Sequence, residues 1–237
     1  LPGVQPLTLL FDPQSPVLAP TSDGHDFPVR RIFCIGRNYA DHAKEMGVEV
    51  DREAPFYFTK WAETVVPSGP IAYPTMTGNY HYEAELVVAI GKGGRDIPAD
   101  KAVDHIYGYA TGLDMTRRDL QLDARAKGRP WDAGKNVEQS SPLGTLHPIS
   151  ETGELSTGAI RLTVNGEVKQ QADLADLIHP VSELIAFLSR AYRLEPGDLI
   201  YTGTPAGVGA VVPGDEIIVS IDGLADTKVI ITPVAHD

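Results

Sequence analysis

The segment HYEAEL at residues 81–86 places Glu83 and Glu85 two positions apart, directly before the apolar run VVAIG. Side chains at positions i and i+2 of a β-strand leave the same face, roughly 7 Å apart. Two carboxylates on a partly buried face repel each other, and one must take up a proton unless a cation lies between them. The spacing alone fits a cation site and a pair of solvated glutamates on an edge strand equally well.

Asp114, in the segment GLDMTRRDLQ, is the candidate for a third carboxylate ligand. Carboxylate oxygens favour Mg²⁺ or Mn²⁺, with Ca²⁺ as a substitute, over zinc. The apolar run after Glu85 predicts burial and so favours the metal interpretation. His81 lies on the same face, and we interpret it as a hydrogen-bonding residue rather than a ligand.

His42 and Glu45 are three residues apart in a predicted helix, so their side chains share a face. A carboxylate partner fixes the tautomer of an imidazole and raises its basicity, as proton abstraction from water requires. An ordinary surface pair is the alternative. The position of the pair after a buried strand, close to Arg37 and Tyr39, favours a catalytic site, and we predict that these two neighbours contact the substrate.

Other polar residues could complete such a site. Arg118 and Gln121 follow Asp114 by four and seven residues, so one helical side could present a guanidinium to an anion and an amide to a carbonyl. Lys135, in DAGKN, could offer an ammonium to a developing oxyanion. The loop GTPAGVG could direct backbone N–H groups and the Thr204 hydroxyl at a carboxylate. Solvated helix polarity, a surface lysine and a tight turn are the alternatives.

Composition excludes several classes of protein. The 237 residues include 32 acidic and 20 basic ones, for a net charge of −12, which argues against binding to nucleic acid or anionic membranes. The one cysteine, Cys34, excludes an intramolecular disulfide and a zinc deaminase site with its P-C-x-x-C segment. G-x-S-x-G, P-loop and EF-hand motifs are absent, which argues against a serine hydrolase, an NTPase and a calcium sensor.

No apolar run approaches the roughly 18 residues of a membrane span, so we expect a cytoplasmic protein.

The elements expected around these residues are mostly strands. Residues 1–28 contain six prolines and are predicted to form an extended lead-in, with one domain over 29–237. Strands are predicted at 29–36, 55–60, 82–91, before Leu113 and after Gly197, with turns at Asn165-Gly166 and Asp222-Gly223; helices are predicted at 38–47, after an N-cap at Asp114, and at 181–192. Because strands outnumber helices and do not alternate with them, the predicted class is α+β and β-rich.

Six segments in order resemble the fumarylacetoacetate hydrolase family, particularly its short acylpyruvate hydrolase branch: GRNYADHAKEMG, PFYFTK, NYHYEAELVVAIG, GYATGLDMTRRDLQ, GRPWDAGKN and LEPGDLIYTGTPAGVG. The resemblance implies a mixed β-roll catalytic domain with a few short flanking helices, usually as a homodimer. Trp61 departs from the family pattern, because related sequences often carry proline after the lysine.

The same resemblance assigns roles to residues. It implies that Glu83, Glu85 and Asp114 bind Mg²⁺ or Mn²⁺, and that His42 and Glu45 activate water on a segment that closes over the substrate. It further implies a set of residues that hold substrate oxygens, stabilise negative charge or line the pocket, namely Lys135, Arg118, Gln121, Thr204 and Lys60.

The expected activity is hydrolysis of the C–C bond of an acylpyruvate, with fumarylpyruvate, a ring-cleavage product of aromatic catabolism, as the favoured substrate. The expected partner is therefore a small anionic 2-oxo acid. Decarboxylation of oxaloacetate and isomerisation or decarboxylation of another 2-oxo acid are alternatives on the same metal site. A metal-binding family member without turnover is an alternative of another class, which the presence of His42 and Glu45 argues against.

Overall fold

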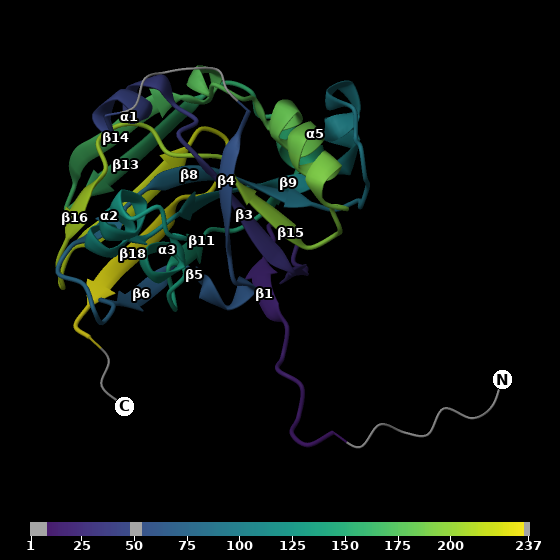
Figure 1. The fold of residues 1–237 in the computed structure, drawn as a ribbon. Helices are drawn as coiled ribbons and strands as arrows, with labels where there is room; N and C mark the ends of the chain where they lie inside the picture. The colour runs from purple at the N-terminus through teal and green to yellow at the C-terminus, as the bar shows by residue number, and fades with distance from the viewer. Residues whose placement is uncertain (1–8, 48–53, 235–237) are drawn as a thin grey trace.

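The computed structural model describes residues 9–47 and 54–234, in which strands outnumber helices (Figure 1). The strands are β1 (Val17–Pro20), β2 (Asp26–Val29), β3 (Arg31–Gly36), β4 (Phe56–Lys60), β5 (Val65–Pro67), β6 (Gly69–Ala72), β7 (Tyr80–Tyr82), β8 (Ala84–Ile90), β9 (Ile106–Leu113), β10 (Thr116–Arg117), β11 (Ser141–Leu143), β12 (His147–Pro148), β13 (Ala159–Val164), β14 (Glu167–Asp173), β15 (Asp198–Tyr201), β16 (Gly209–Val211), β17 (Glu216–Ile221) and β18 (Thr227–Thr232). The helices are α1 (Ala40–Glu45), α2 (Arg118–Ala126), α3 (Asp132–Lys135), α4 (Ile149–Thr152) and α5 (Val181–Ala191), with 3₁₀ segments η1 (Ala62–Thr64), η2 (Ala99–His105) and η3 (Leu174–Asp176).

The central sheet has the strand order β4-β3-β15-β8-β9-β11-β5, with β12 paired to β9. Every residue of β8 is buried. Because side chains alternate along a strand, Leu86 and Val88 pack into one hydrophobic cluster while Val87 and Ala89 pack into another on the opposite face. The predicted strand buried on both faces is confirmed, although Tyr82 belongs to the separate strand β7.

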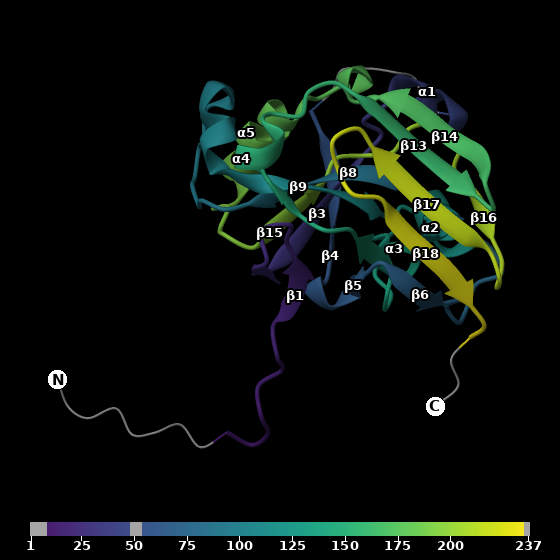
Figure 2. The same ribbon diagram turned by 180° about the vertical axis from the view of Figure 1, so that it is seen from behind.

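A second sheet, with the order β14-β13-β17-β18-β6, supplies the cluster on one face of the central sheet (Figure 2). Leu162 of β13 and Ile217 of β17 pack there with Leu86. The predicted turn at Asn165-Gly166 joins β13 to β14. The predicted β-rich α+β class is confirmed, and the few helices are short and flank the sheets. In the described residues, no helix is long and apolar enough to cross a membrane.

A hairpin of β1 and β2 supplies the cluster on the other face, where Phe27 and Val29 pack against the central sheet. The segment assigned from sequence to an extended lead-in thus contributes strands, and the expected boundary after residue 28 falls inside β2.

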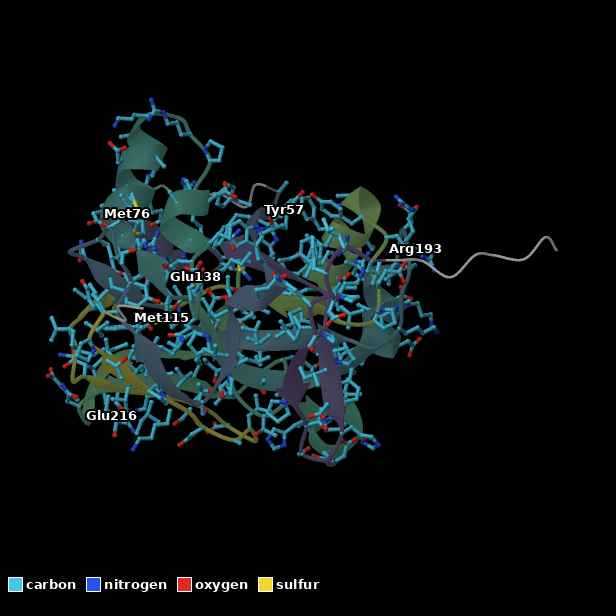
Figure 3. All side chains as sticks on the ribbon, turned by 90° about the horizontal axis from the view of Figure 1, so that it is seen from below. Tyr57, Met76, Met115, Glu138, Arg193 and Glu216 are labelled. Carbon is cyan, nitrogen blue, oxygen red and sulfur yellow. The ribbon has the colours of Figure 1, made fainter. Side chains whose placement is uncertain are left out.

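Burial follows the layering of the sheets. Met115, beside Asp114, is fully buried, whereas Met76 is exposed at the rim of the molecule (Figure 3).

The predicted N-cap role of Asp114 is wrong. α2 begins at Arg118, and its cap residue Arg117 makes no side-chain capping hydrogen bond. Thr116 and Arg117 instead form β10, which pairs with β7. The Asp114 carboxylate accepts hydrogen bonds from two buried lysines, so it is not available to cap a helix.

The contact between β9 and β12 gives a stability test. A Cβ added to Gly108 would lie 2.0 Å from the carbonyl oxygen of His147, which is backbone and cannot rotate away. We expect Gly108→Ala to lower the free energy of unfolding by about 2–3 kcal/mol, or the melting temperature by roughly 5–10 °C. Gly78→Ala is the matched control, because nothing lies within 4 Å of the added atom. Equal melting temperatures for the two variants would contradict this close contact.

Candidate active site

Strand pairing brings the three predicted carboxylates together. Ala84 of β8 is paired with Leu113 of β9, and the Asp114 N–H donates to the Glu83 carbonyl oxygen at 2.9 Å. Glu83, Glu85 and Asp114 are all buried and each offers an oxygen within 4.8 Å of the others. Because β8 lies between β15 and β9, these are not solvated residues of an edge strand.

Buried cations surround two of these carboxylates. Lys135 Nζ donates to Glu83 Oε2, Asp114 Oδ2 and Thr116 Oγ1, each at 2.7 Å, so all three ammonium protons are used. Lys60 Nζ donates to Asp114 Oδ1 at 2.9 Å from the side away from the pocket. The Arg118 guanidinium donates to Glu83 Oε1.

The two glutamates therefore differ in their electrostatics. Burial opposes ionisation of Glu83, but Lys135 and Arg118 hold its pKa well below the usual range. Burial, Asp114 and Glu83 together raise the pKa of Glu85 well above the usual range. Among the described residues, no lysine or arginine lies within ion-pair distance of Glu85. It is the carboxylate that still needs a cation.

Glu85 is held by a backbone group of the loop after β15. Gly203 N–H donates to Glu85 Oε2 at 2.8 Å. Gly203 has φ of +103°, and an added Cβ would lie 2.7 Å from Asn38 Cβ, so the loop needs glycine here. The next residue, Thr204, lines the pocket, and its hydroxyl accepts a hydrogen bond from Gln170 Nε2 at 2.8 Å.

His42 and Glu45 form the predicted pair at the end of α1. His42 Nδ1 lies 3.2 Å from Glu45 Oε2, which also accepts from Gly207 N–H at 3.1 Å. With Nδ1–H donating to Glu45, the His42 Nε2 atom is left as a proton acceptor. The His42 side chain is buried and lines the pocket that contains the carboxylates.

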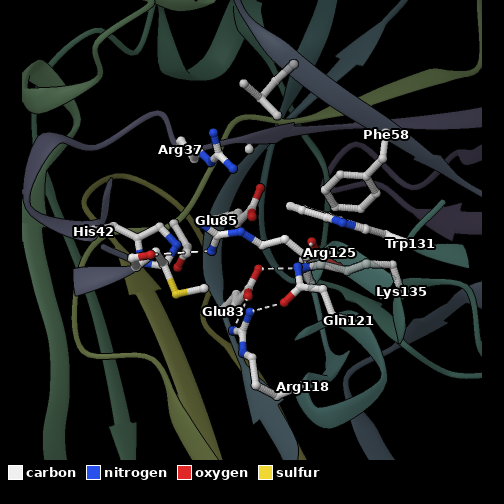
Figure 4. A pocket seen from close by; sticks show the side chains of 15 residues that line it. Arg37, His42, Phe58, Glu83, Glu85, Arg118, Gln121, Arg125, Trp131 and Lys135 are labelled. Carbon is white, nitrogen blue, oxygen red and sulfur yellow. Dashed lines mark hydrogen bonds and ion pairs between the residues drawn. The ribbon is translucent and has the colours of Figure 1, made fainter. Parts of the chain in front are cut away.

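A cavity of about 40 Å³ joins these groups (Figure 4). Most of the predicted site residues line it: Arg37, His42, Glu83, Glu85, Asp114, Arg118, Gln121, Lys135 and Thr204. Glu45 lies behind His42, and Lys60 lies behind Asp114. Tyr39 does not line this cavity; it is buried and lines a separate hollow together with Asp176.

The pocket also contains residues that the sequence analysis does not single out: Ile35, Met46, Phe58, Arg125 and Trp131. Phe58 and Trp131 form one wall, with ring centroids 5.8 Å apart. Arg125 follows Gln121 by four residues on α2, so helical spacing alone places it on the same face. The aromatic wall joins β4 to the residue before α3 and has no comparable local signal.

The donor set fits a divalent cation. Three carboxylates offer only oxygen ligands, and the ion pairs of Lys60, Lys135 and Arg118 go to Glu83 and Asp114. Burying Glu85 without a cation is costly, since a desolvated carboxylate is destabilised by two like charges beside it. Lys135 stays protonated, because Asp114 and Glu83 raise its pKa although burial opposes this, so it supplies charge rather than acting as a base.

Known proteins share this fold and much of this sequence. Fumarylpyruvate hydrolase of a Ralstonia species is 54% identical over 191 residues, covering 79% of this chain and 99% of that protein. A mitochondrial oxaloacetate decarboxylase of Dictyostelium discoideum is 42% identical over 82% of this chain and 90% of its own length. The crystal structure of fumarylpyruvate hydrolase from Pseudomonas aeruginosa, in complex with Mn²⁺ and pyruvate, superposes with a TM-score of 0.93 at 50% identity, covering 95% of this chain and all of that one.

The family model described as the C-terminal part of fumarylacetoacetate (FAA) hydrolase matches residues 31–231. That range contains every strand of the central sheet and every residue of the pocket. The chain belongs to the fumarylacetoacetate hydrolase family.

Proposed function

We propose that this protein is a metal-dependent hydrolase that cleaves fumarylpyruvate, an acylpyruvate, to fumarate and pyruvate. The observation that carries the proposal is that the His42–Glu45 pair and the three carboxylates open on one cavity. The 54% identity to a fumarylpyruvate hydrolase supports the choice of substrate. The Mn²⁺ and pyruvate bound by the Pseudomonas relative support both the metal and the product.

Glu83, Glu85 and Asp114 would hold Mg²⁺ or Mn²⁺, since all three are oxygen donors. Bound there, the ion supplies Lewis-acid polarisation of the 2-oxo acid and charge neutralisation for the departing enolate. Arg118 and Gln121 line the same cavity and would orient the substrate oxygens. Arg118 is held for this task by Glu83, by Gln121 and by His81 Nδ1 at 3.5 Å.

His42 would act as the general base. Its Nε2 takes a proton from water while Glu45 stabilises the imidazolium, and the hydroxide adds to the acyl carbonyl carbon. Lys135 places a permanent positive charge beside the cavity, where the oxyanion develops. The C–C bond between the acyl carbon and pyruvate C3 then breaks, its electron pair stays on pyruvate, and C3 takes a proton from His42.

Oxaloacetate decarboxylation is a second candidate, favoured by the 42% identity to the Dictyostelium decarboxylase. Both reactions expel pyruvate as its enolate. They differ because only hydrolysis needs an attacking water and an acyl group.

A substrate panel tests the proposal. With Mg²⁺ or Mn²⁺, the protein should remove the ultraviolet absorbance of fumarylpyruvate and release equal amounts of fumarate and pyruvate. Evolution of CO₂ from oxaloacetate at a higher kcat/KM than hydrolysis would instead assign the decarboxylase activity.

Replacing the base tests the role of His42. We expect His42→Ala to lower kcat for hydrolysis by roughly 10²- to 10⁴-fold, since proton abstraction from water is lost. Affinity for Mn²⁺, measured by calorimetry, should stay unchanged. His179→Ala is the control, because His179 forms a similar pair with Glu183 outside this pocket. If His42→Ala hydrolyses the substrate at the wild-type rate, His42 is not the general base.

The two glutamates should respond in opposite directions to the same substitution. In the metal-free protein, Glu85→Gln should raise the melting temperature by a few degrees, because a buried carboxylate without a cation partner is removed. Glu83→Gln should lower the free energy of unfolding by about 3 kcal/mol or more, because Lys135 and Arg118 lose a shared partner.

Thermal melts in EDTA and in excess Mn²⁺ measure this difference. Both variants should lose most of the stabilisation that Mn²⁺ gives the wild type. If both variants change the melting temperature in the same direction in EDTA, the proposed electrostatic difference between Glu83 and Glu85 is refuted.

A further inference from the structure

Arg125 is, like Arg37, a pocket cation that the proposed mechanism leaves without a role. We propose that its guanidinium binds the distal carboxylate of the acyl group, and so selects acylpyruvates that end in a carboxylate. This inference rests on the proposed function and specifies its substrate class.

Other cations of the pocket are already engaged. Lys135 and Arg118 both donate to the buried Glu83 carboxylate. The Arg37 guanidinium lies over the Phe56 ring, 5.5 Å from its centroid. A second carboxylate of the substrate would have to compete with these partners.

Arg125 is held differently. It is partly exposed, and its Nη1 donates to the Met46 carbonyl oxygen at 3.3 Å, longer than the usual 2.9–3.0 Å of such bonds. Within residues 9–47 and 54–234, no carboxylate lies within ion-pair distance of it. An ionised carboxylate is a stronger acceptor than a carbonyl and can take both N–H groups of a guanidinium. The bond to Met46 is therefore one that a substrate carboxylate can replace.

The position of Arg125 suits the far end of the substrate. Its side chain extends across the pocket toward the wall that carries His42 (Figure 4). The cavity of about 40 Å³ is too small for fumarylpyruvate, a seven-carbon dianion, so binding must displace side chains, and Arg125 is the weakly held one. A neighbouring hollow of about 330 Å³, lined by Phe58, Trp131 and Arg129, is the competing place for the acyl group.

Comparison of fumarylpyruvate with acetylpyruvate, which has a methyl group in place of the distal carboxylate arm, tests the inference. Arg125→Gln should raise KM for fumarylpyruvate roughly ten- to hundredfold, the worth of a hydrogen bond to a charged group, and change acetylpyruvate kinetics far less. The KM of Arg125→Lys for fumarylpyruvate should lie between those of the wild type and Arg125→Gln. Fumarate binding to the Mn²⁺-loaded protein, measured by calorimetry, should weaken in parallel. Arg129→Gln, the matched control, should leave all these values unchanged.

Two outcomes would overturn the inference. If Arg125→Gln raises KM equally for fumarylpyruvate and acetylpyruvate, the role of Arg125 is to hold the Met46 backbone and not to bind the distal carboxylate. A fumarylpyruvate-specific loss in Arg129→Gln in place of Arg125→Gln would put the distal carboxylate in the neighbouring hollow. Failure of the proposed function looks different: the wild type would hydrolyse neither acylpyruvate, while loss of fumarate binding in Arg125→Gln would still support a carboxylate site at Arg125.

Discussion

The structure depends on burying three carboxylates against three fixed cations. Glu83 and Asp114 are neutralised by Lys135, Lys60 and Arg118, whereas Glu85 accepts one backbone N–H and faces two like charges. The metal-free fold thus carries an unfavourable group at its centre. Stability is lost at this position, where a divalent cation would give Glu85 the cationic partner that Glu83 and Asp114 already have.

The fold makes that arrangement rigid. The carboxylates stand at the ends of β8 and β9, which are hydrogen bonded to each other and covered on both faces by hydrophobic clusters. His42 and Gly203 come from segments that follow two other strands of the same sheet, β3 and β15. Because neighbouring strand ends meet at one edge, residues far apart in the chain converge without a long loop. The overall charge of −12 does not oppose an anionic substrate, since the positive charge is concentrated here.

Local patterns predicted the parts of this site that depend on short spacings. Glu83 with Glu85 and His42 with Glu45 are visible because strand and helix periods fix which side chains share a face. The wall of Phe58 and Trp131 depends on the packing of distant segments, which no periodicity encodes. Asp114 was misread as a helix cap, since a carboxylate before a helix has the same local signature as one used in a site. The strands of residues 17–29 were hidden by prolines that fit in edge strands as well as in coils.

The carboxylate side of the pocket cannot by itself decide which reaction this protein catalyses. Hydrolysis of an acylpyruvate and decarboxylation of oxaloacetate both end in the enolate of pyruvate, and the same cation and the same Lys135 charge would stabilise it in each. Selectivity must therefore arise from the rest of the pocket lining, where a water, an acyl group and any distal charge have to be accommodated. His42, Arg125, Phe58 and Trp131 belong to that lining. Relatives that keep the carboxylates and change these other residues can change reaction without rebuilding the fold.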